Sequence, residues 1–263
     1  FFLRDIDEED STVLKVEFMS EEMKVLRSYS SDNELKQNKI DLKEGFHTLR
    51  WGGGVEGFEL PEGVMPPRGS QGFIESFSVV PGKYNVKLSY GDYEKISSFE
   101  ILPDPRNEID GSHFARKSEL MKDIHDDISD IYSSLKKMQS AREQLDDLES
   151  RLSDEKFSKI LELSKRTVKL IDDTELKLIS PKQKTFQDVI NFRNQLDAQF
   201  LDLLSKVDGN VPPITSGELT RYNDLKSDWL KIKTGYNQVV SNIQDINTML
   251  IESSVPFISR GGE

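Results

Sequence analysis

The 263-residue sequence contains no cysteine and only three histidines. The absence of cysteine excludes a disulfide-stapled scaffold, a thiol nucleophile, an iron–sulfur cluster and a cysteine zinc site. It leaves the compartment open, because a chain of this length can bury a core large enough to fold without disulfides in an oxidising space. No run approaches the roughly 18 apolar residues of a membrane-spanning helix. The chain opens on Phe1 rather than Met, so we expect a fragment or processed chain whose targeting signal is not visible.

Basic residues are also in deficit. The chain has 47 acidic and 35 basic side chains, which give a formal net charge of −12. A nucleic-acid-binding protein needs a basic face to release counterions from phosphate, and a polybasic membrane anchor needs a similar excess of Lys and Arg. The charge balance therefore argues against both classes.

Glycine and proline are concentrated in the first part of the chain. Ten of the 16 glycines lie in the first 91 residues, and neither Gly nor Pro occurs from Ser112 through Ser180. Because these residues supply turns and interrupt helices, we predict strands and loops first and long helices afterwards. Pro103 and Pro105 indicate a short, stiff connection. The predicted division is a β domain at 1–103, a linker at 104–111 and a helical domain at 112–263.

The first part alternates apolar and polar residues with a period of two, which is typical of half-buried strands. Segments 12–18 and 23–29 flank a polar Ser-Glu-Glu turn and predict a hairpin. The glycine-rich stretch 52–72 is predicted to be a loop. About seven short strands without an intervening helix pattern favour an antiparallel β-sandwich over an α/β domain. The further predicted strands are 45–51, 74–80, 84–90 and 93–102.

The second part repeats apolar residues with a period near 3.5, which predicts helices with one apolar stripe each. The last helix opens on the capping box Thr215-Ser216-Gly217-Glu218 and carries the most regular heptad. Short connections predict antiparallel neighbours and hence an up-down bundle. The heptads also suit a dimeric coiled coil, but four stretches in one chain can satisfy one another, so we favour an intramolecular bundle. The predicted helices lie near 113–152, 154–180, 185–208 and 216–253.

The string Gly52-Gly53-Gly54-Val55-Glu56-Gly57 matches the glycine spacing of a dinucleotide-binding loop. Such a loop must open a helix whose N-terminus receives the pyrophosphate. The following segment, 58–63, is neither helical in pattern nor electropositive, so we interpret the glycines as a loop at a strand end. No G-x-S-x-G string accompanies them, and a backbone oxyanion hole is therefore not predicted.

The three histidines show no metal-binding spacing. His113 and His125 are twelve residues apart rather than four, and no H-E-x-x-H string occurs. We expect both, and His47 on a strand, to be surface or capping residues. Trp51 and Trp229 lie on apolar periodic faces and are expected in cores.

Acidic clusters are present, but their surroundings favour solvated surfaces. The residues Asp126, Asp127 and Asp130 lie beside His125 and suit a hard cation, yet they fall on the polar side of a predicted helix. The acidic leader 5–10 has the density of a calcium loop but lacks the glycine and the bidentate glutamate of an EF-hand. We therefore predict no catalytic, cofactor-binding or metal-binding residue and expect that the chain is not an enzyme.

Three segments of the first part, together with the order of the whole chain, resemble known proteins. Segments 14–29, 44–51 and 80–88 look like the small Ig-like sandwich of flagellar hook-capping proteins and many secreted bacterial proteins. That module, the connection 99–106 and a long helical part containing Ser180-Pro181-Lys182 and Val255-Pro256-Phe257 resemble the C-terminal region of bacterial sortilin-like proteins. These carry BNR-repeat β-propellers and are often labelled glycosyl hydrolases. The sequence departs from the family after Trp51, where three glycines replace the usual Asp.

The resemblance implies an accessory region of an exported protein, because the propeller that would carry catalytic or ligand-binding residues is not in this sequence. We expect a non-catalytic interaction or scaffolding region in the periplasm, at the cell surface or in the medium. Its expected partner is a protein, namely the upstream propeller of the same full-length chain or another cell-surface protein. Two alternatives remain open. One is an accessory part of a carbohydrate-active enzyme with a sugar site near Trp51, Phe58 and Phe73, and the other is a helical self-assembly module.

Overall fold

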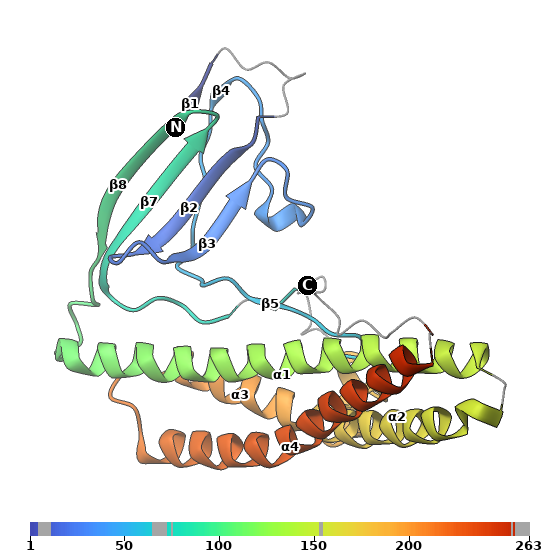
Figure 1. The fold of residues 1–263 in the computed structure, drawn as a ribbon. Helices are drawn as coiled ribbons and strands as arrows, with labels where there is room; N and C mark the ends of the chain where they lie inside the picture. Colours follow the sequence, from blue (N-terminus) through green and yellow to red (C-terminus); the bar gives the residue numbers. More distant parts are fainter. Residues whose placement is uncertain (5–11, 65–72, 75, 153–154, 254, 256–263) are drawn as a thin grey trace. The chain divides into compact units, whose positions relative to one another are not determined.

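The computed structural model describes residues 1–4, 12–64, 73–74, 76–152, 155–253 and 255 (Figure 1). Within these residues it combines antiparallel β-sheets with four α-helices, so the predicted mixed α and β class is confirmed. The chain divides into two compact units. We call the first the β unit, and it comprises Phe1–Gly57, Glu75–Glu119 and Val211–Pro213. We call the second the helical unit, and it comprises Phe58–Ile74, Leu120–Asn210 and Ile214–Glu263.

A four-stranded antiparallel sheet forms the centre of the β unit, with the strand order β3-β2-β7-β8. β2 and β3 form the predicted hairpin, and a second hairpin joins β7 to β8 through Gly91 and Asp92. Gly91 has a φ of +55°, which glycine adopts without strain. Two short strands, β1 and β4, pair antiparallel as a separate ribbon. The bounds are β1 Phe2–Leu3, β2 Leu14–Ser20, β3 Val25–Ser30, β4 Gly45–Phe46, β7 Gly82–Tyr90 and β8 Tyr93–Ile101.

The apolar residues of the period-two pattern form the core of the β unit. Leu14 and Val16 of β2 are buried in one cluster with Leu3 of β1. Trp51 stacks on Phe18 with ring centroids 4.4 Å apart and is partly buried against the same cluster. The sheet therefore buries one face, and the segments that contain Leu3 and Trp51 cover it.

The predicted strand 45–51 is a strand only at β4. Residues 47–51 are described but form no strand. Leu49 and Trp51 both pack against the core from this segment, so the period of two reflects alternate burial rather than a ladder of backbone hydrogen bonds. Alternating burial can therefore occur without strand pairing, and the period of two in the sequence indicates only the alternating burial.

The predicted strand 74–80 is also interrupted. β6 (Phe73–Ile74) pairs antiparallel with β5 (Phe58–Glu59), and both belong to the helical unit. Farther along, Ser78 forms a single antiparallel bridge with Gly54 in the β unit. The predicted strand is therefore divided between the two units. Its start, at β6, pairs with β5, and Ser78 pairs with Gly54, and both partners lie in the predicted loop 52–72.

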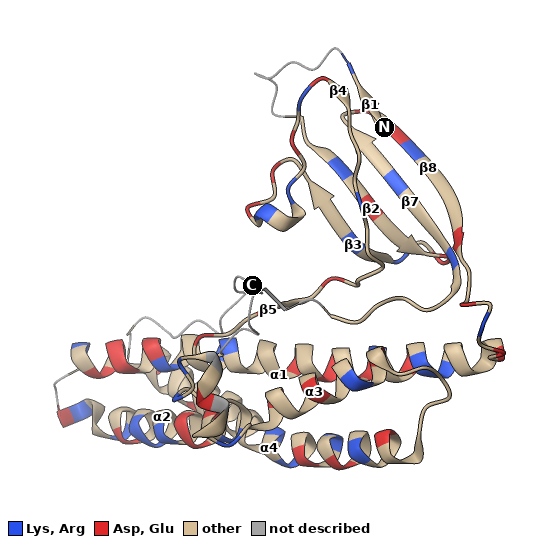
Figure 2. Cartoon of the chain, turned by 180° about the vertical axis from the view of Figure 1, so that it is seen from behind, with Lys and Arg blue, Asp and Glu red and all other residues tan. Residues whose placement is uncertain are grey.

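Long helices make up most of the helical unit. At 1.5 Å per residue, the 41 residues of α1 give a length of about 60 Å. Acidic and basic residues are interspersed along the helices (Figure 2). No helix among the described residues has both the length and the apolar character needed to cross a membrane. The bounds are α1 Gly111–Arg151, α2 Ser158–Leu178, α3 Leu196–Gly209 and α4 Ser216–Glu252.

The apolar stripes of the two longest helices are buried within this chain. Full burial of one large apolar side chain contributes roughly 1.5–3 kcal/mol, so these stripes are the main source of stability in the helical unit. They comprise Ile124, Ile128, Ile131, Leu135, Met138, Leu145 and Leu148 in α1, and Leu225, Trp229, Val239, Ile243, Ile246 and Leu250 in α4.

Polar contacts show the relative directions of α1, α2 and α4. Arg142 of α1 pairs with Asp172 of α2 at 3.1 Å, and Glu149 pairs with Lys165 at 2.8 Å. The partner number falls as the α1 number rises, so α1 and α2 are antiparallel. The pairs between α1 and α4 rise together, from Asp127 with Tyr222 to Asp130 with Trp229, so these two helices are parallel.

The helix α3 runs antiparallel to α4. Its residue Gln199 accepts a hydrogen bond from Arg221 at 2.5 Å, and Asn210 at its C-terminus donates to Glu218 at 2.7 Å. The helix α2 is also antiparallel to α4, because it is antiparallel to the parallel partner α1. The helices α2 and α3 therefore run in the same direction, opposite to that of α1 and α4. The expectation that neighbours in sequence are antiparallel fails at this connection.

The predicted third helix, 185–208, is also shorter than expected. Residues Phe186–Ile190 form a separate 3₁₀ helix closed by a capping box between Thr185 and Asp188, and α3 begins only at Leu196. Polar side chains on either side bind the backbone of the connection between them, as Gln183 donates to the carbonyl of Phe192 and Gln199 to that of Asn194. Such bonds compete with helix continuation. The predicted start of the second helix, at 153–154, lies outside the described residues.

Residues 58–64 were predicted as part of the first domain but belong to the helical unit. The Phe58 side chain is buried with its ring 5.8 Å from that of Tyr132. Gln139 of α1 donates from Nε2 to the carbonyl of Glu62 at 2.9 Å and accepts at Oε1 from its N–H at 3.2 Å. Gly63 has a φ of +77°, a conformation that favours glycine and completes the turn. These contacts explain why the segment belongs to the helical unit rather than to the β unit.

Gly235 of α4 lies close to Thr174 of α2. A Cβ at this position would lie 2.7 Å from the Thr174 hydroxyl oxygen. We expect Gly235→Ala to lower the free energy of unfolding by about 1–2 kcal/mol, although Ala is the better helix former. Urea unfolding measures the change. Gly209→Ala, where no atom lies within 4 Å, is the control and should be neutral or stabilising. In a Thr174→Ala background, Gly235→Ala should no longer destabilise, and a persistent loss would refute the contact.

Candidate binding groove

An open groove lies on the inner face of the β unit, at the hairpin end of β7 and β8. Cross-strand partners share a face, so Val86, Leu88 and Tyr90 of β7 lie beside the β8 residues with which they pair. Those partners are Ser97, Lys95 and Tyr93. Val86, Leu88 and Tyr90 are only partly buried, because the cover over the core does not extend across this end of the sheet.

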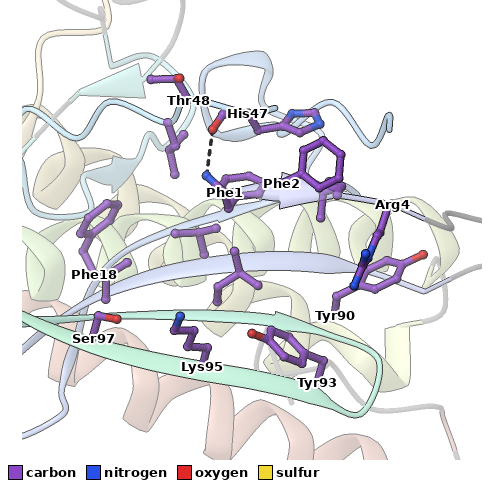
Figure 3. Close-up of a pocket in the computed structure, with 15 residues that line it drawn as sticks. Phe1, Phe2, Arg4, Phe18, His47, Thr48, Tyr90, Tyr93, Lys95 and Ser97 are labelled. Carbon is purple, nitrogen blue, oxygen red and sulfur yellow. Dashed lines mark hydrogen bonds between the residues drawn. The ribbon is translucent and has the colours of Figure 1, made fainter. Parts of the chain in front are cut away.

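The opposite wall comes from β1 and the segment after β4. The backbone nitrogen of Phe1 donates to the carbonyl of His47 at 3.0 Å, and the N–H of His47 donates to the carbonyl of Phe1 at 2.8 Å. The two rings stack, with centroids 5.2 Å apart. Phe2 contacts Phe46 with centroids 4.7 Å apart. Figure 3 shows Phe1 and Phe2 on one side of the groove and Tyr93 and Lys95 on the other.

The groove has a volume of about 780 Å³ and a cationic lining. Among its described lining residues, Arg4 and Lys95 are basic and none is acidic, although acids outnumber bases in the chain. Aromatic side chains are unusually exposed around it, with Phe2 53%, Tyr93 56% and Phe46 90% accessible. The arrangement suits an apolar ligand that carries negative charge.

The residue types on the inner face of β8 explain why this end of the sheet is open. At the other end of β8, the inner-face residue Phe99 lies 6.0 Å from the Trp51 ring, and that aromatic pair closes the core. The inner-face residues at the hairpin end are Tyr93, Lys95 and Ser97, which do not make an apolar core. The prediction of 93–102 as a strand did not include this signal, which lies in the polar residues at every second position.

The glycine-rich string does not form a phosphate-binding loop. The carboxylate of Glu56 accepts hydrogen bonds from the Ser28 N–H and the Asn38 side chain, both at 3.3 Å. It also pairs with the buried Arg27 at 3.4 Å. The indole N–H of Trp51 donates to the carbonyl of Gly54 at 2.9 Å. The string is therefore fixed against β3 by an acid, which would repel a phosphate.

Two of the residues predicted for a sugar site, Trp51 and Phe58, pack against core residues of their own units. Phe58 is 3% exposed and belongs to the helical unit, where its ring packs against His125 and Tyr132. Trp51 stacks within the core of the β unit. The side chain of Phe73 lies outside the described residues. Phe58 is therefore not exposed as an aromatic platform beside the 52–72 loop.

Each histidine has its own local contacts. His47 stacks on Phe1 and its Nε2 lies 2.6 Å from the carbonyl of Lys43. The backbone N–H of His113 donates to the carbonyl of Asp110 at the start of α1, which is a capping position. His125 packs its ring 4.7 Å from that of Phe58. The described residues contain no group of three or more His, Asp or Glu side chains that could hold a metal ion.

The acid cluster of α1 forms interhelical pairs instead of one site. Asp126 is exposed and pairs with Lys122 at 2.9 Å. Asp127, which was predicted on a solvated face, is only 5% exposed and pairs with Lys226 and the hydroxyl of Tyr222 on α4. The prediction was wrong for Asp127, because a parallel partner helix covers that side of α1. The acidic leader 5–10 lies outside the described residues.

The carboxyl group of Asp197 has a raised pKa. It lies in the first turn of α3 and is 7% exposed. Burial raises the pKa of Asp197 to about 7. Burial also raises the pKa of the Tyr132 phenol on α1, and the nearby Asp197 charge adds to the effect. A carboxyl with such a pKa can transfer protons near neutrality, but nearly complete burial within the helical unit favours a structural role.

Comparisons with family models, with curated proteins and with solved structures give no match for this chain. The geometry of the groove is thus the main basis for a functional assignment.

The pairing of Asp127 predicts a specific loss of stability. Lys226→Ala removes the cation from a carboxylate that is 7% exposed, and we expect the free energy of unfolding to fall by about 2 kcal/mol. Lys231→Ala, which removes an exposed pair with Asp228, is the control and should change it by less than about 0.5 kcal/mol. Urea unfolding measures both. Adding Asp127→Asn to Lys226→Ala should restore part of the loss, and equal losses for the two lysines would contradict the interpretation.

The buried carboxyl predicts a pH-dependent stability. The folded pKa of Asp197 lies above the usual unfolded value of about 3.9, so between about pH 4 and 7 the native state binds more protons. Stability is therefore lost as pH rises through this window. Asp197→Asn cannot ionise, and its free energy of unfolding relative to wild type should rise by about 2–3 kcal/mol between about pH 5 and 8.5.

Urea unfolding at the two pH values makes the test for Asp197. Asp202→Asn, an exposed site on the same helix, is the matched control and should show no comparable gain. A gain of equal size for both variants, or none for Asp197→Asn, would contradict the burial argument.

Proposed function

We propose that this chain is a non-catalytic interaction region that binds a partner protein through the groove of the β unit. The observation that carries the proposal is the combination of an apolar groove of about 780 Å³ with exposed aromatic residues at its rim. Monomeric proteins rarely leave such surfaces uncovered unless they bind something. Aromatic side chains are also the residues that most often anchor protein interfaces.

In this proposal the β unit is an Ig-like sandwich, formed by the four-stranded sheet and the β1–β4 ribbon. The helical unit is an up-down bundle of three passes, in which α2 and α3 share the middle pass. The apolar stripes of α1 and α4 are satisfied within the chain, which suits a rigid spacer or scaffold better than a self-assembly module. The roughly 60 Å length of α1 fits the same role.

The sequence resemblance supplies the proposed context. We place the chain after the BNR-repeat β-propeller of an exported, sortilin-like protein, where it presents the propeller or joins it to other cell-surface proteins. The partner is then the propeller of the same full-length chain or a cell-surface protein. The proposal rests on the order of an Ig-like segment, a proline-rich connection and long helices in the sequence.

The test is to mix this chain with the segment that its open reading frame encodes upstream and to measure association by sedimentation velocity. We expect a complex that is weakened at least about tenfold by Phe46→Ser, because this substitution removes an aromatic side chain that is 90% exposed and contacts Phe2 of the groove. Leu230→Ser, at an exposed position on α4, is the matched control and should leave association unchanged.

Three results would count against the proposed function. One is an open reading frame that encodes no propeller, and another is a lack of association between two folded segments. The third is equal weakening by the Phe46 and Leu230 substitutions, which would indicate a non-specific hydrophobic effect.

A further inference from the structure

We infer that the groove and the outer edge of β8 together bind an extended segment of a partner protein that is apolar and acidic, and that this segment joins the sheet as a further strand. The inference rests on the proposed function and specifies the chemistry of the partner. It depends on three features of the β unit: the hydrogen-bonding groups along the edge, the side chains that face the groove, and the charge of the lining.

The edge of β8 offers backbone hydrogen-bonding groups in a regular order. Gly91 and Asp92 form a two-residue hairpin loop, so the flanking pair of Tyr90 and Tyr93 is hydrogen-bonded. In an antiparallel ladder such pairs alternate, and Tyr93, Lys95 and Ser97 therefore direct their N–H and C=O groups toward β7. The residues between them, Glu94, Ile96 and Ser98, direct theirs outward.

The outward groups have no strand partner in the described part of the chain. There, β8 pairs with β7 alone and forms one edge of the four-stranded sheet. It is nine residues long, and its first six residues are all exposed. A long edge of this kind is a template for another strand, and many peptide-recognition domains use it in that way.

The groove-facing side chains lie beside this edge. Tyr93, Lys95 and Ser97 line the groove, whereas Glu94 and Ile96 lie on the opposite face of the sheet. An added strand would place every second side chain over the groove and the others on the far face. A volume of about 780 Å³ accommodates several apolar side chains. The segment that fits is therefore one in which apolar residues recur at every second position.

The charge of the lining sets the sign of the partner. Arg4 and Lys95 line the groove from opposite walls, and no described lining residue is acidic. A carboxylate at one groove-facing position of the segment can pair with either cation. Lysine on an edge strand also disfavours pairing with basic or uncharged strands, so Lys95 acts as a selectivity element for an acidic one.

A fatty acid shares the apolar and anionic character of this ligand. It has no backbone N–H or C=O groups, however, and would leave the outward groups of β8 unused. A second copy of the chain could also pair through its own β8, but the β8 side chains that line the groove include a lysine and no acid, so it would bring no negative charge to the cationic lining. The edge and the charge together favour a peptide segment from an acidic partner.

The experiment uses the full chain and a fluorescein-labelled peptide, acetyl-Thr-Val-Thr-Glu-Thr-Phe-Thr-Val-Thr-amide, in which apolar residues and one Glu occupy alternate positions. Fluorescence anisotropy measures binding. We expect a dissociation constant in the micromolar range and at least about tenfold weaker binding when the Glu is replaced by Lys. Lys95→Glu should reverse that preference.

Two substitutions at one position test the strand edge. Ile96→Pro removes an outward N–H without touching the pairing with β7, and it should weaken binding at least about tenfold. Ile96→Ala keeps the N–H and should change binding by less than about threefold. Circular dichroism checks that both variants are folded, and Lys95→Glu provides a second readout that does not depend on the proline.

Several outcomes would overturn the inference. They are no peptide binding up to about 1 mM, binding that is indifferent to Ile96→Pro and Lys95→Glu, displacement of the peptide by oleate at lower concentration, and a dimer formed through β8. If the partner complex of the proposed function forms normally with Ile96→Pro and Lys95→Glu, the proposed function stands and this inference falls. If the peptide binds as expected but the upstream segment does not, the inference about the strand edge stands and the proposed function falls.

Discussion

A β-sheet with one apolar face must cover that face, and incomplete cover is the constraint on which the β unit depends. At one end of the sheet, Trp51 closes the core over Phe18 and Phe99. At the hairpin end, the cover stops at the β1 residues, and the side chains of β7 remain partly buried. The groove, its exposed aromatic rim and its two cations all lie in the space that this leaves. The proposed binding function depends on this end of the sheet, where the apolar face is not fully covered.

The helical unit meets the same requirement differently. Its long apolar stripes are buried within the unit, and several polar groups that are buried with them pair with residues on neighbouring helices. Asp127 pairs with Lys226, and Glu175 accepts from both Gln139 at 2.8 Å and Arg142 at 2.5 Å. Such buried polar pairs rarely add much net stability, but they fix which helices are neighbours and in which direction they run. A unit with its own core and register suits the role of a rigid support.

Sequence patterns predicted the elements whose signal is local. The hairpin of β2 and β3, the long helix α1 and the capping box of α4 each depend on residues within a few positions of one another. The patterns failed where the outcome depends on distant partners. The segment 58–64 belongs to the helical unit because Phe58 packs against Tyr132. Asp127 is buried because a parallel helix covers it. The groove could be suspected from Tyr93, Lys95 and Ser97, which are poor core residues, but its opposite wall at Phe1 and His47 has no local signature.

The central claim is that the outer edge of β8 is a binding surface, and hydrogen–deuterium exchange of its backbone amides tests it most directly. The amides of Glu94, Ile96 and Ser98 point outward, while those of Lys95 and Ser97 bond to β7. Binding of an acidic, apolar strand should slow exchange at the three outward amides and leave the two inward amides nearly unchanged. Unchanged exchange at Glu94, Ile96 and Ser98 under saturating partner would contradict the account.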